Sequence, residues 1–298
     1  MKPCTDCVRK CGVDRPDTLN GEGTFGFCGC PRNPVVARAM LHRWEEPCIS
    51  GKNGSGAVFF SGCNLRCVFC QNHEISRGSE GRAVDAAGLR EVFLRLRDRG
   101  VHNINLVTPT HYSNIIAEAL SGVKLGIPVV WNSSGYESVE TLRSLHGLVQ
   151  IYMPDYKYSD PALARRWSMA EDYPQVALAA IKEMYRQRGE FVLDDDGIMQ
   201  SGVLIRHLIM PGAGENTLRC IDTIEDNLPP DKIIFSLMAQ YTPMPGLEAY
   251  PELCRPISTE EYERCRSYFD FSDIIYGFSQ SPEAATDEMI PDFDGTGV

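Results

Sequence analysis

Short apolar runs alternate with longer amphipathic stretches along most of this chain, and this alternation constrains its fold more than any other feature. The runs of strand length span 57–60, 103–107, 127–131, 148–152, 202–208 and 233–238. Helical patterns follow them at 86–99, 113–121, 138–145, 161–188 with an interruption at Pro174, 217–226 and 259–269. Strands that alternate with helices form parallel sheets through βα units. We therefore predict an α/β fold, a partial (β/α)6 TIM-type barrel, with 274–276 as an additional final strand.

The two ends of the chain differ from this pattern. Residues 1–56 are rich in Gly, Pro and Cys and show little helical or strand periodicity, which predicts an irregular Cys-rich N-terminal extension. Residues 57–298 then form the barrel with its C-terminal elements. The tail 291–298 is acidic, and we expect it to be loosely ordered.

The charge balance excludes some classes of partner. The chain has 29 basic and 40 acidic residues and a net charge of −11, which argues against general attraction to nucleic acid or to anionic membranes. No apolar run approaches the roughly 18 residues of a membrane helix, and the first residues lack the hydrophobic segment of a signal peptide. We expect a soluble, cytoplasmic protein.

Twelve cysteines are many for such a chain, and in a reducing compartment their clustering suggests metal rather than disulfides. Cys63, Cys67 and Cys70 directly follow the first predicted strand, at the active face of a βα barrel. Thiolates are the usual ligands of iron–sulfur clusters, and a four-iron cube normally takes four of them, so three leave one iron open to substrate or cofactor. A zinc site or three packing cysteines are the alternatives.

The spacing Cys-x3-Cys-x2-Cys, with Phe69 before the last cysteine, resembles the radical S-adenosylmethionine (SAM) superfamily. This resemblance implies a 4Fe-4S cluster whose open iron is chelated by the amino and carboxylate groups of SAM. It also implies reductive cleavage of SAM to methionine and a 5'-deoxyadenosyl radical, with the electron supplied by a low-potential donor such as flavodoxin or ferredoxin. Cys63, Cys67 and Cys70 would carry this electron chemistry, and Phe69 would border the cofactor.

Within the superfamily, residues 57 to 242 resemble the pyruvate formate-lyase activating enzyme group. The matching positions are the loop Asn132-Ser133-Ser134-Gly135, the strand end Met153-Pro154-Asp155-Tyr156-Lys157, the strand Ile205-Arg206-His207 that ends in Pro211-Gly212, and Gln240 with Tyr241. The resemblance implies that Asn132, Ser133, Asp155, Lys157, Arg206, Gln240 and Tyr241 contact the cofactor.

Met153 and Asp155 would help to bind a monovalent cation beside the cofactor carboxylate, although Asn132 stands where the family usually has an acid. The alternatives are that Asp155 and Lys157 cap a strand and that Arg206 forms a structural ion pair.

The chain departs from this group after the second predicted strand. Where the group has a Gly-Gly-Glu loop for the cofactor's amino group, this sequence reads Thr108-Pro109-Thr110-His111-Tyr112. The hydroxyls of Thr108 and Thr110, backbone carbonyls or neutral His111 remain available as acceptors. His111 and Tyr112 either face the substrate or belong to a helix-entry turn.

A second set of cysteines lies in the N-terminal extension. Cys4, Cys7, Cys11 and Cys28, with Cys30 as a fifth, supply soft ligands on a segment too short to fold by apolar burial alone. A zinc ion bound by the first four, a second iron–sulfur cluster and no metal are all compatible with this pattern. The surrounding sequence also resembles an extension in a less characterised branch related to the activating enzymes.

The resemblance implies that the radical abstracts hydrogen from a substrate. Activating enzymes act on a glycyl-radical partner protein, which makes protein activation the first hypothesis, with a small molecule, a peptide or RNA as alternative substrates. An iron–sulfur electron carrier and a zinc-bound scaffold are the alternatives outside enzymes. A carrier would be expected to supply a fourth cysteine ligand beside Cys63–Cys70.

Overall fold

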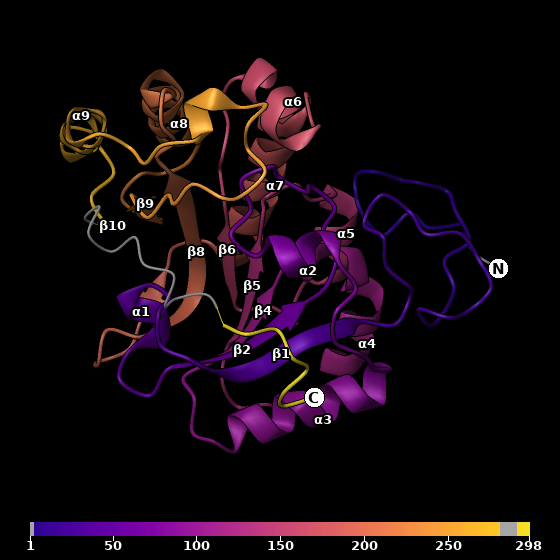
Figure 1. The fold of residues 1–298 in the computed structure, drawn as a ribbon. Coiled ribbons are helices and arrows are strands. Elements are labelled where there is room, and N and C mark those ends of the chain that lie inside the picture. Colours follow the sequence, from indigo (N-terminus) through magenta and orange to yellow (C-terminus); the bar gives the residue numbers. More distant parts are fainter. Residues whose placement is uncertain (1–2, 281–290) are drawn as a thin grey trace.

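The apolar runs form a curved sheet of mostly parallel strands in a computed structural model that describes residues 3–280 and 291–298 (Figure 1). The strands are β1 (Val35–His42), β2 (Ser55–Phe60), β3 (Arg82–Ala83), β4 (Ile104–Val107), β5 (Val129–Ser133), β6 (Ile151–Pro154), β7 (Val192–Leu193), β8 (Met199–Leu208), β9 (Ile234–Met238) and β10 (Gly277–Ser279). Their order is β10-β9-β8-β6-β5-β4-β2-β1-β3, with β7 paired to β8. The pairs from β2 to β10 along this order are parallel, which confirms the predicted partial barrel.

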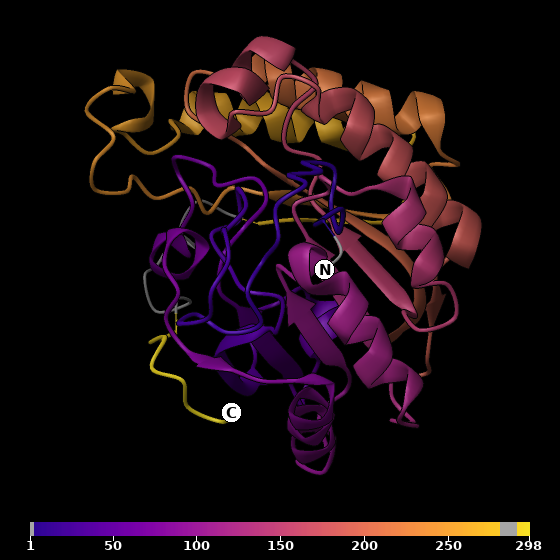
Figure 2. The same cartoon turned by 90° about the vertical axis from the view of Figure 1, so that its right-hand side faces the viewer.

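Most of the helices cover the outer side of the curved sheet (Figures 1 and 2). The helices are α1 (Pro47–Ser50), α2 (His73–Arg77), α3 (Ala86–Arg97), α4 (Ser113–Ser121), α5 (Val139–Ser144), α6 (Pro161–Ser168), α7 (Tyr173–Arg188), α8 (Gly214–Asn227) and α9 (Thr259–Asp270), with 3-10 turns at Thr110–Tyr112 and Pro251–Leu253. Side chains cap several of these helices: Asp85, Ser138 and Asp160 accept N-terminal amide hydrogens, and Ser258 forms a capping box. Pro174 lies in the first turn of α7, so the predicted interruption is confirmed. No helix within 3–280 or 291–298 is long and apolar enough to cross a membrane.

The strands divide their side chains between two cores, as the period of two requires. In β5, Trp131 packs in the large core beneath the helices, whereas Val130 packs inside the barrel. The short helix α1 fills the bottom of the barrel, because Cys48 and Ile49 join Val130 and Ile151 in this inner cluster. A closed floor therefore lies below the carboxyl ends of the parallel strands.

The structure corrects the prediction that residues 1–56 lack a regular element. Val35–His42 forms β1, which runs antiparallel beside β2 and needs no crossover helix. The Gly- and Pro-rich residues around it obscured a run that is mostly buried. The additional final strand also begins later than predicted, at Gly277 instead of residue 274.

Both ends of the described chain pack against this framework. Residues 3–33 contain no helix or strand and lie beside α4 and α5, where Asp6 contacts Asn114 and Thr141 (Figure 1). The tail 291–298 runs along β1: the Gly295 amide donates to Ala37, and the Ala39 amide donates to Thr296. The tail was expected to be loosely ordered, but these backbone bonds attach it to the sheet.

Candidate active site

The loop after β2 carries the three cysteines. Cys63 and Cys67 are buried and Cys70 is half-buried. The Sγ atom of Cys63 accepts hydrogen bonds from the amides of Leu65 (3.3 Å) and Arg66 (3.5 Å), and the Ser168 hydroxyl donates to the Cys67 Sγ atom (3.0 Å). Burial raises the pKa of Cys63 to about 12. Thiols that already receive several hydrogen bonds are suited to bind metal as thiolates, since metal coordination deprotonates them.

A cavity of about 230 Å³ opens beside this loop. Its walls include most of the predicted site residues: Cys63, Cys67, Phe69, Cys70, Thr108, Asn132, Ser133, Asp155, Lys157, Arg206, Gln240 and Tyr241. They come from the loop after β2 and from the carboxyl ends of β4, β5, β6, β8 and β9. Motifs that are far apart in the sequence thus meet at one site.

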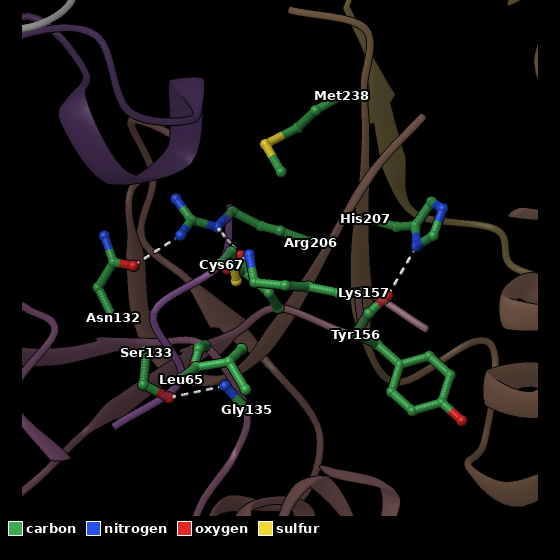
Figure 3. A network of polar contacts seen from close by, with 12 residues as sticks. Leu65, Cys67, Asn132, Ser133, Gly135, Tyr156, Lys157, Arg206, His207 and Met238 are labelled. Carbon is green, nitrogen blue, oxygen red and sulfur yellow. Dashed lines mark hydrogen bonds and ion pairs between the residues drawn. The ribbon is translucent and has the colours of Figure 1, made fainter. Parts of the chain in front are cut away.

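Charged side chains form a connected network on one wall of this cavity (Figure 3). Asp155 accepts from the Lys157 Nζ atom (2.5 Å) through one oxygen and from the Arg206 Nε atom (3.1 Å) through the other. Burial alone would raise the pKa of Asp155, but Lys157 and Arg206 outweigh burial and lower it. Lys157 also lies close enough to Cys67 to favour the thiolate of that cysteine, against the opposing effect of burial on its pKa.

Glu45 belongs to the same network, although the sequence did not suggest it. Its carboxylate accepts from the Arg206 Nη1 atom (3.3 Å), the Asn105 amide (2.8 Å) and the Asn132 amide (3.3 Å). Burial raises the pKa of Glu45, while Arg206 favours its ionised form. Glu45 lies in the turn between β1 and α1, so recognising 35–42 as a strand would have been the signal that pointed to it.

The side chain of Asn132 bridges Arg206 and Glu45 in this network. Its Oδ1 atom accepts from the Arg206 Nη2 atom (2.6 Å), and its Nδ2 atom donates to Glu45. An amide side chain thus connects Arg206 to an acid from another segment of the chain. Arg206 is held on three sides by Asp155, Asn132 and Glu45.

Of the residues predicted around the cofactor, Thr110 and Met153 lie outside the walls of the cavity. Thr110 is buried and donates to Glu137 (2.7 Å), and Met153 packs in the inner apolar cluster. His111 and Tyr112 are also buried, with the Ser61 carbonyl as a shared partner, and burial lowers the pKa of His111 to about 3. From this loop Thr108 alone reaches the cavity, in the left-handed region at φ 61°.

The far end of the cavity is formed after β9 by Gln240 and Tyr241. The Gln240 carbonyl accepts from the Gln71 side chain (3.1 Å), which follows the cysteine triplet. The Tyr241 hydroxyl donates to the Leu253 carbonyl (2.6 Å), and its ring meets Phe69 edge-on at 6.4 Å. The rings of Tyr241 and Phe69 thus form an aromatic part of the cavity wall next to the cysteine loop.

The N-terminal cysteines gather beside this loop. Cys4, Cys7 and Cys28 are buried and Cys11 is half-buried. Burial raises the pKa of Cys7 to about 12, and the nearby thiols of Cys28, Cys4 and Cys11 contribute to this increase. Within residues 3–280 and 291–298, no three His, Cys, Asp or Glu side chains surround a common metal position, and this includes Cys63, Cys67 and Cys70.

A family model and a curated relative both match this chain. Residues 57–219 match the Radical SAM superfamily. The uncharacterized protein MJ0674 of Methanocaldococcus jannaschii is 30% identical over 278 residues, which cover 89% of this chain and 73% of that protein.

Among solved structures, Streptococcus suis SuiB bound to S-adenosylmethionine is similar with a TM-score of 0.53 and 15% identity, over 76% of this chain and 50% of SuiB. A second SuiB structure gives a TM-score of 0.49 and 14% identity, over 74% and 47%. The chain spans about half the length of SuiB, and the likeness in the first structure concerns the fold.

The matched segment contains the cysteine loop and the strand ends that carry Asn132, Asp155 and Arg206. The family implies a 4Fe-4S cluster and SAM as cofactors. Since the match covers more than half of the chain, the protein belongs to the radical SAM superfamily.

Proposed function

We propose that this protein is an activating enzyme that generates a glycyl radical on a partner protein. The observation that supports the radical chemistry is the cavity in which three cysteine thiols meet Lys157, Arg206 and Asp155. The choice of a glycyl-radical partner rests on the resemblance to the activating enzyme group. When bound, the 4Fe-4S cluster and SAM supply methionine and a 5'-deoxyadenosyl radical, with one electron taken from a reduced flavodoxin or ferredoxin in the cytoplasm. The partner's glycine then loses a hydrogen atom, which leaves as part of deoxyadenosine.

The residues of the site fit these cofactors. The cysteine loop offers three thiols and two amide donors to the Cys63 Sγ atom, which suits cluster ligands. Lys157 and Arg206 supply hydrogen-bond donors for a carboxylate, and their partners Asp155 and Glu45 fix them in place before the cofactor binds. Ser133, Thr108 and Gln240 add polar groups to the wall around the cofactor.

Two additional metal sites, one for a monovalent cation and one at the N-terminal cysteines, stay predictions. Asp155 would be the carboxylate ligand of a monovalent cation, but both its oxygens already contact cationic side chains. The side chain of Met153 faces the inner apolar cluster, so this residue would contribute its backbone carbonyl. The N-terminal cysteines would hold zinc or a second iron–sulfur cluster.

The first test is anaerobic reconstitution with iron and sulfide, reduction and addition of SAM. We expect a brown protein that forms deoxyadenosine and a Cys63→Ala variant that forms none, because the open-iron chemistry needs all three ligands. Cys254→Ala is the matched control, since that thiol is exposed and outside the cavity. Undiminished deoxyadenosine from Cys63→Ala would refute the assignment.

A second experiment addresses the substrate. Affinity purification of the tagged protein from its own cells under anaerobic conditions should recover a glycyl-radical partner. After incubation with SAM and reductant, that partner should show the doublet signal of a glycyl radical by electron paramagnetic resonance (EPR). A reconstituted enzyme that cleaves SAM but produces no such signal on any co-purified protein would favour a small molecule, a peptide or RNA.

A further inference from the structure

The side chain of Arg9 connects the N-terminal cysteines to the cysteine loop of the barrel. Its Nε atom donates to the Asn64 carbonyl (2.9 Å), between Cys63 and Cys67 in sequence. Its Nη1 and Nη2 atoms donate to the carbonyls of Met169 (2.9 Å) and Ser168 (3.4 Å). Since the Ser168 hydroxyl donates to the Cys67 Sγ atom, one guanidinium contacts the cysteine loop and also the segment that hydrogen-bonds one of its sulfur atoms.

A second contact lies on the other side of the same loop. The Cys30 Sγ atom donates to the Ser61 carbonyl (3.2 Å), and a Cβ atom on Gly62 would overlap this sulfur. Gly62 has a φ of +79° and directly precedes Cys63. The absence of a side chain at position 62 thus allows the N-terminal segment to pack against the start of the cysteine loop.

Phe27 forms a third contact. Its ring lies under the Arg9 guanidinium at 4.0 Å and near the Arg66 guanidinium at 5.7 Å. Arg66 belongs to the cysteine loop, whereas Phe27 and Arg9 belong to the extension. Such cation–π contacts add to the attachment of one segment to the other.

The conformation of Arg9 depends on the segment that carries it. Arg9 lies between Cys7 and Cys11, in residues 3–33, where the structure describes no helix or strand. The Phe27 amide donates to the Cys11 Sγ atom (3.3 Å), and the Arg15 Nη1 atom lies 3.7 Å from the Cys4 Sγ atom. Donors directed at sulfur are typical of thiolate metal ligands, and a metal is the usual means of fixing so irregular a segment.

We propose that Cys4, Cys7, Cys11 and Cys28 bind one thiolate-coordinated metal centre, zinc or iron, that holds Arg9 against the cysteine loop of the barrel. Arg9 is then a positioning residue for the 4Fe-4S cluster. This inference rests on the proposed function only in that Cys63, Cys67 and Cys70 bind the cluster.

The metal is tested with a full-length variant in which Cys63, Cys67 and Cys70 are all alanine. After purification with zinc, or reconstitution with iron and sulfide, elemental analysis should find stoichiometric zinc or iron on this variant. A further Cys7→Ser change should remove it. No bound metal in either preparation would overturn the proposal, whatever the activity of the wild-type enzyme.

The positioning role is tested with Arg9→Gln in the otherwise unchanged chain. We expect its reconstituted cluster to be lost about 10-fold faster to a chelator, and its EPR signal to respond less to SAM, because loss of a supporting contact weakens metal sites by this order. Arg9→Lys keeps the charge but not the forked arrangement of donors. Its rate of cluster loss should lie between those of wild type and Arg9→Gln. Lys10→Ala is the control, since Lys10 is exposed and pairs with Glu140 instead of the loop.

The outcomes separate this inference from the proposed function. Equal cluster lifetimes and EPR responses in wild type, Arg9→Gln and Lys10→Ala would overturn the positioning role even if SAM is cleaved. Fast cluster loss in Arg9→Gln alone would support it even if no glycyl-radical partner is found.

Discussion

At the scale of single residues, the site combines side chains from distant parts of the chain. Glu45, from the turn after β1, supplies a carboxylate to the strand ends through hydrogen bonds to Asn132 and Arg206. Asp155 and Glu45 therefore neutralise Lys157 and Arg206 in a largely buried network. Removing one partner of such a network leaves a charge without compensation, which costs more than the pair contributes.

We predict that Glu45→Gln weakens SAM binding about 10-fold, because Arg206 loses one of the groups that orient it. Equilibrium binding to the reconstituted enzyme measures this change separately from turnover. Adding Asn132→Asp to Glu45→Gln should recover part of the affinity, since an aspartate at 132 would again face the Arg206 Nη2 atom with a negative charge. Affinity that is unaffected by Glu45→Gln would show that Asp155 and Asn132 orient Arg206 without Glu45.

A backbone position has an equally specific requirement. Gly135, in the loop after β5, has a φ of +75°, and a Cβ atom there would overlap the Asp155 carbonyl. Gly135→Ala should reduce the free energy of unfolding on the order of 2–3 kcal/mol, measured by urea denaturation. Gly147→Ala is the control, because its φ is +87° but nothing lies within 4 Å, so it should show the smaller cost of the left-handed conformation alone. Equal losses would exclude the overlap as the cause.

At the scale of elements, the sequence predicted the parts of the fold that repeat. Parallel strands buried on both faces appear as continuous apolar runs, and the polar residues at their carboxyl ends meet at one edge, so Asp155 and Arg206 could be placed together. β1 was missed because it pairs antiparallel without a crossover helix, and Glu45 was missed with it. Thr110 was misplaced because a sequence does not show which residues of a turn face a cavity and which face Glu137.

One contact between elements should depend on pH. Glu252, in the 3-10 turn Pro251–Leu253, binds the Arg166 guanidinium (2.8 Å) and the Trp167 indole (3.1 Å) of α6. The hydrogen bond from Arg166 lowers the pKa of Glu252 from 4.5 to about 2. A lowered pKa in the folded state gives stability that is present above about pH 4.5 and is lost as the pH falls towards 2.

We therefore predict that Glu252→Gln lowers the free energy of unfolding by about 1 kcal/mol or less at pH 7, since the pair is partly exposed. The difference from wild type should shrink between pH 4.5 and pH 3, as urea denaturation at each pH would show. Glu171→Gln is the control, because Glu171 is exposed and 4.0 Å from Arg165. A difference that stays constant with pH would mean that packing, not charge, attaches this turn to α6.

At the scale of the whole molecule, the tail connects the end of the described chain to the region of the site. Phe293 meets Phe59 of β2 edge-on at 5.6 Å, and Pro291 lies in the wall of the cavity. Phe293→Ala should loosen residues 291–298 and speed hydrogen exchange at the Ala39 amide, which donates to Thr296. Phe271→Ala, at a side chain that is 91% exposed, should leave this exchange unchanged. Unaltered exchange in Phe293→Ala would show that the backbone bonds alone retain the tail.

The same tail affects how copies of this protein behave toward one another. An uncovered strand at the side of a sheet is a template on which other chains can add strands and aggregate. β3 covers Val35 and Val36 of β1, and the tail bonds to Ala37 and Ala39, so little of this side is open to such pairing. At the opposite side, β10 is only three residues long. Copies of this protein thus offer one another few free backbone groups for self-association at the edges of the sheet.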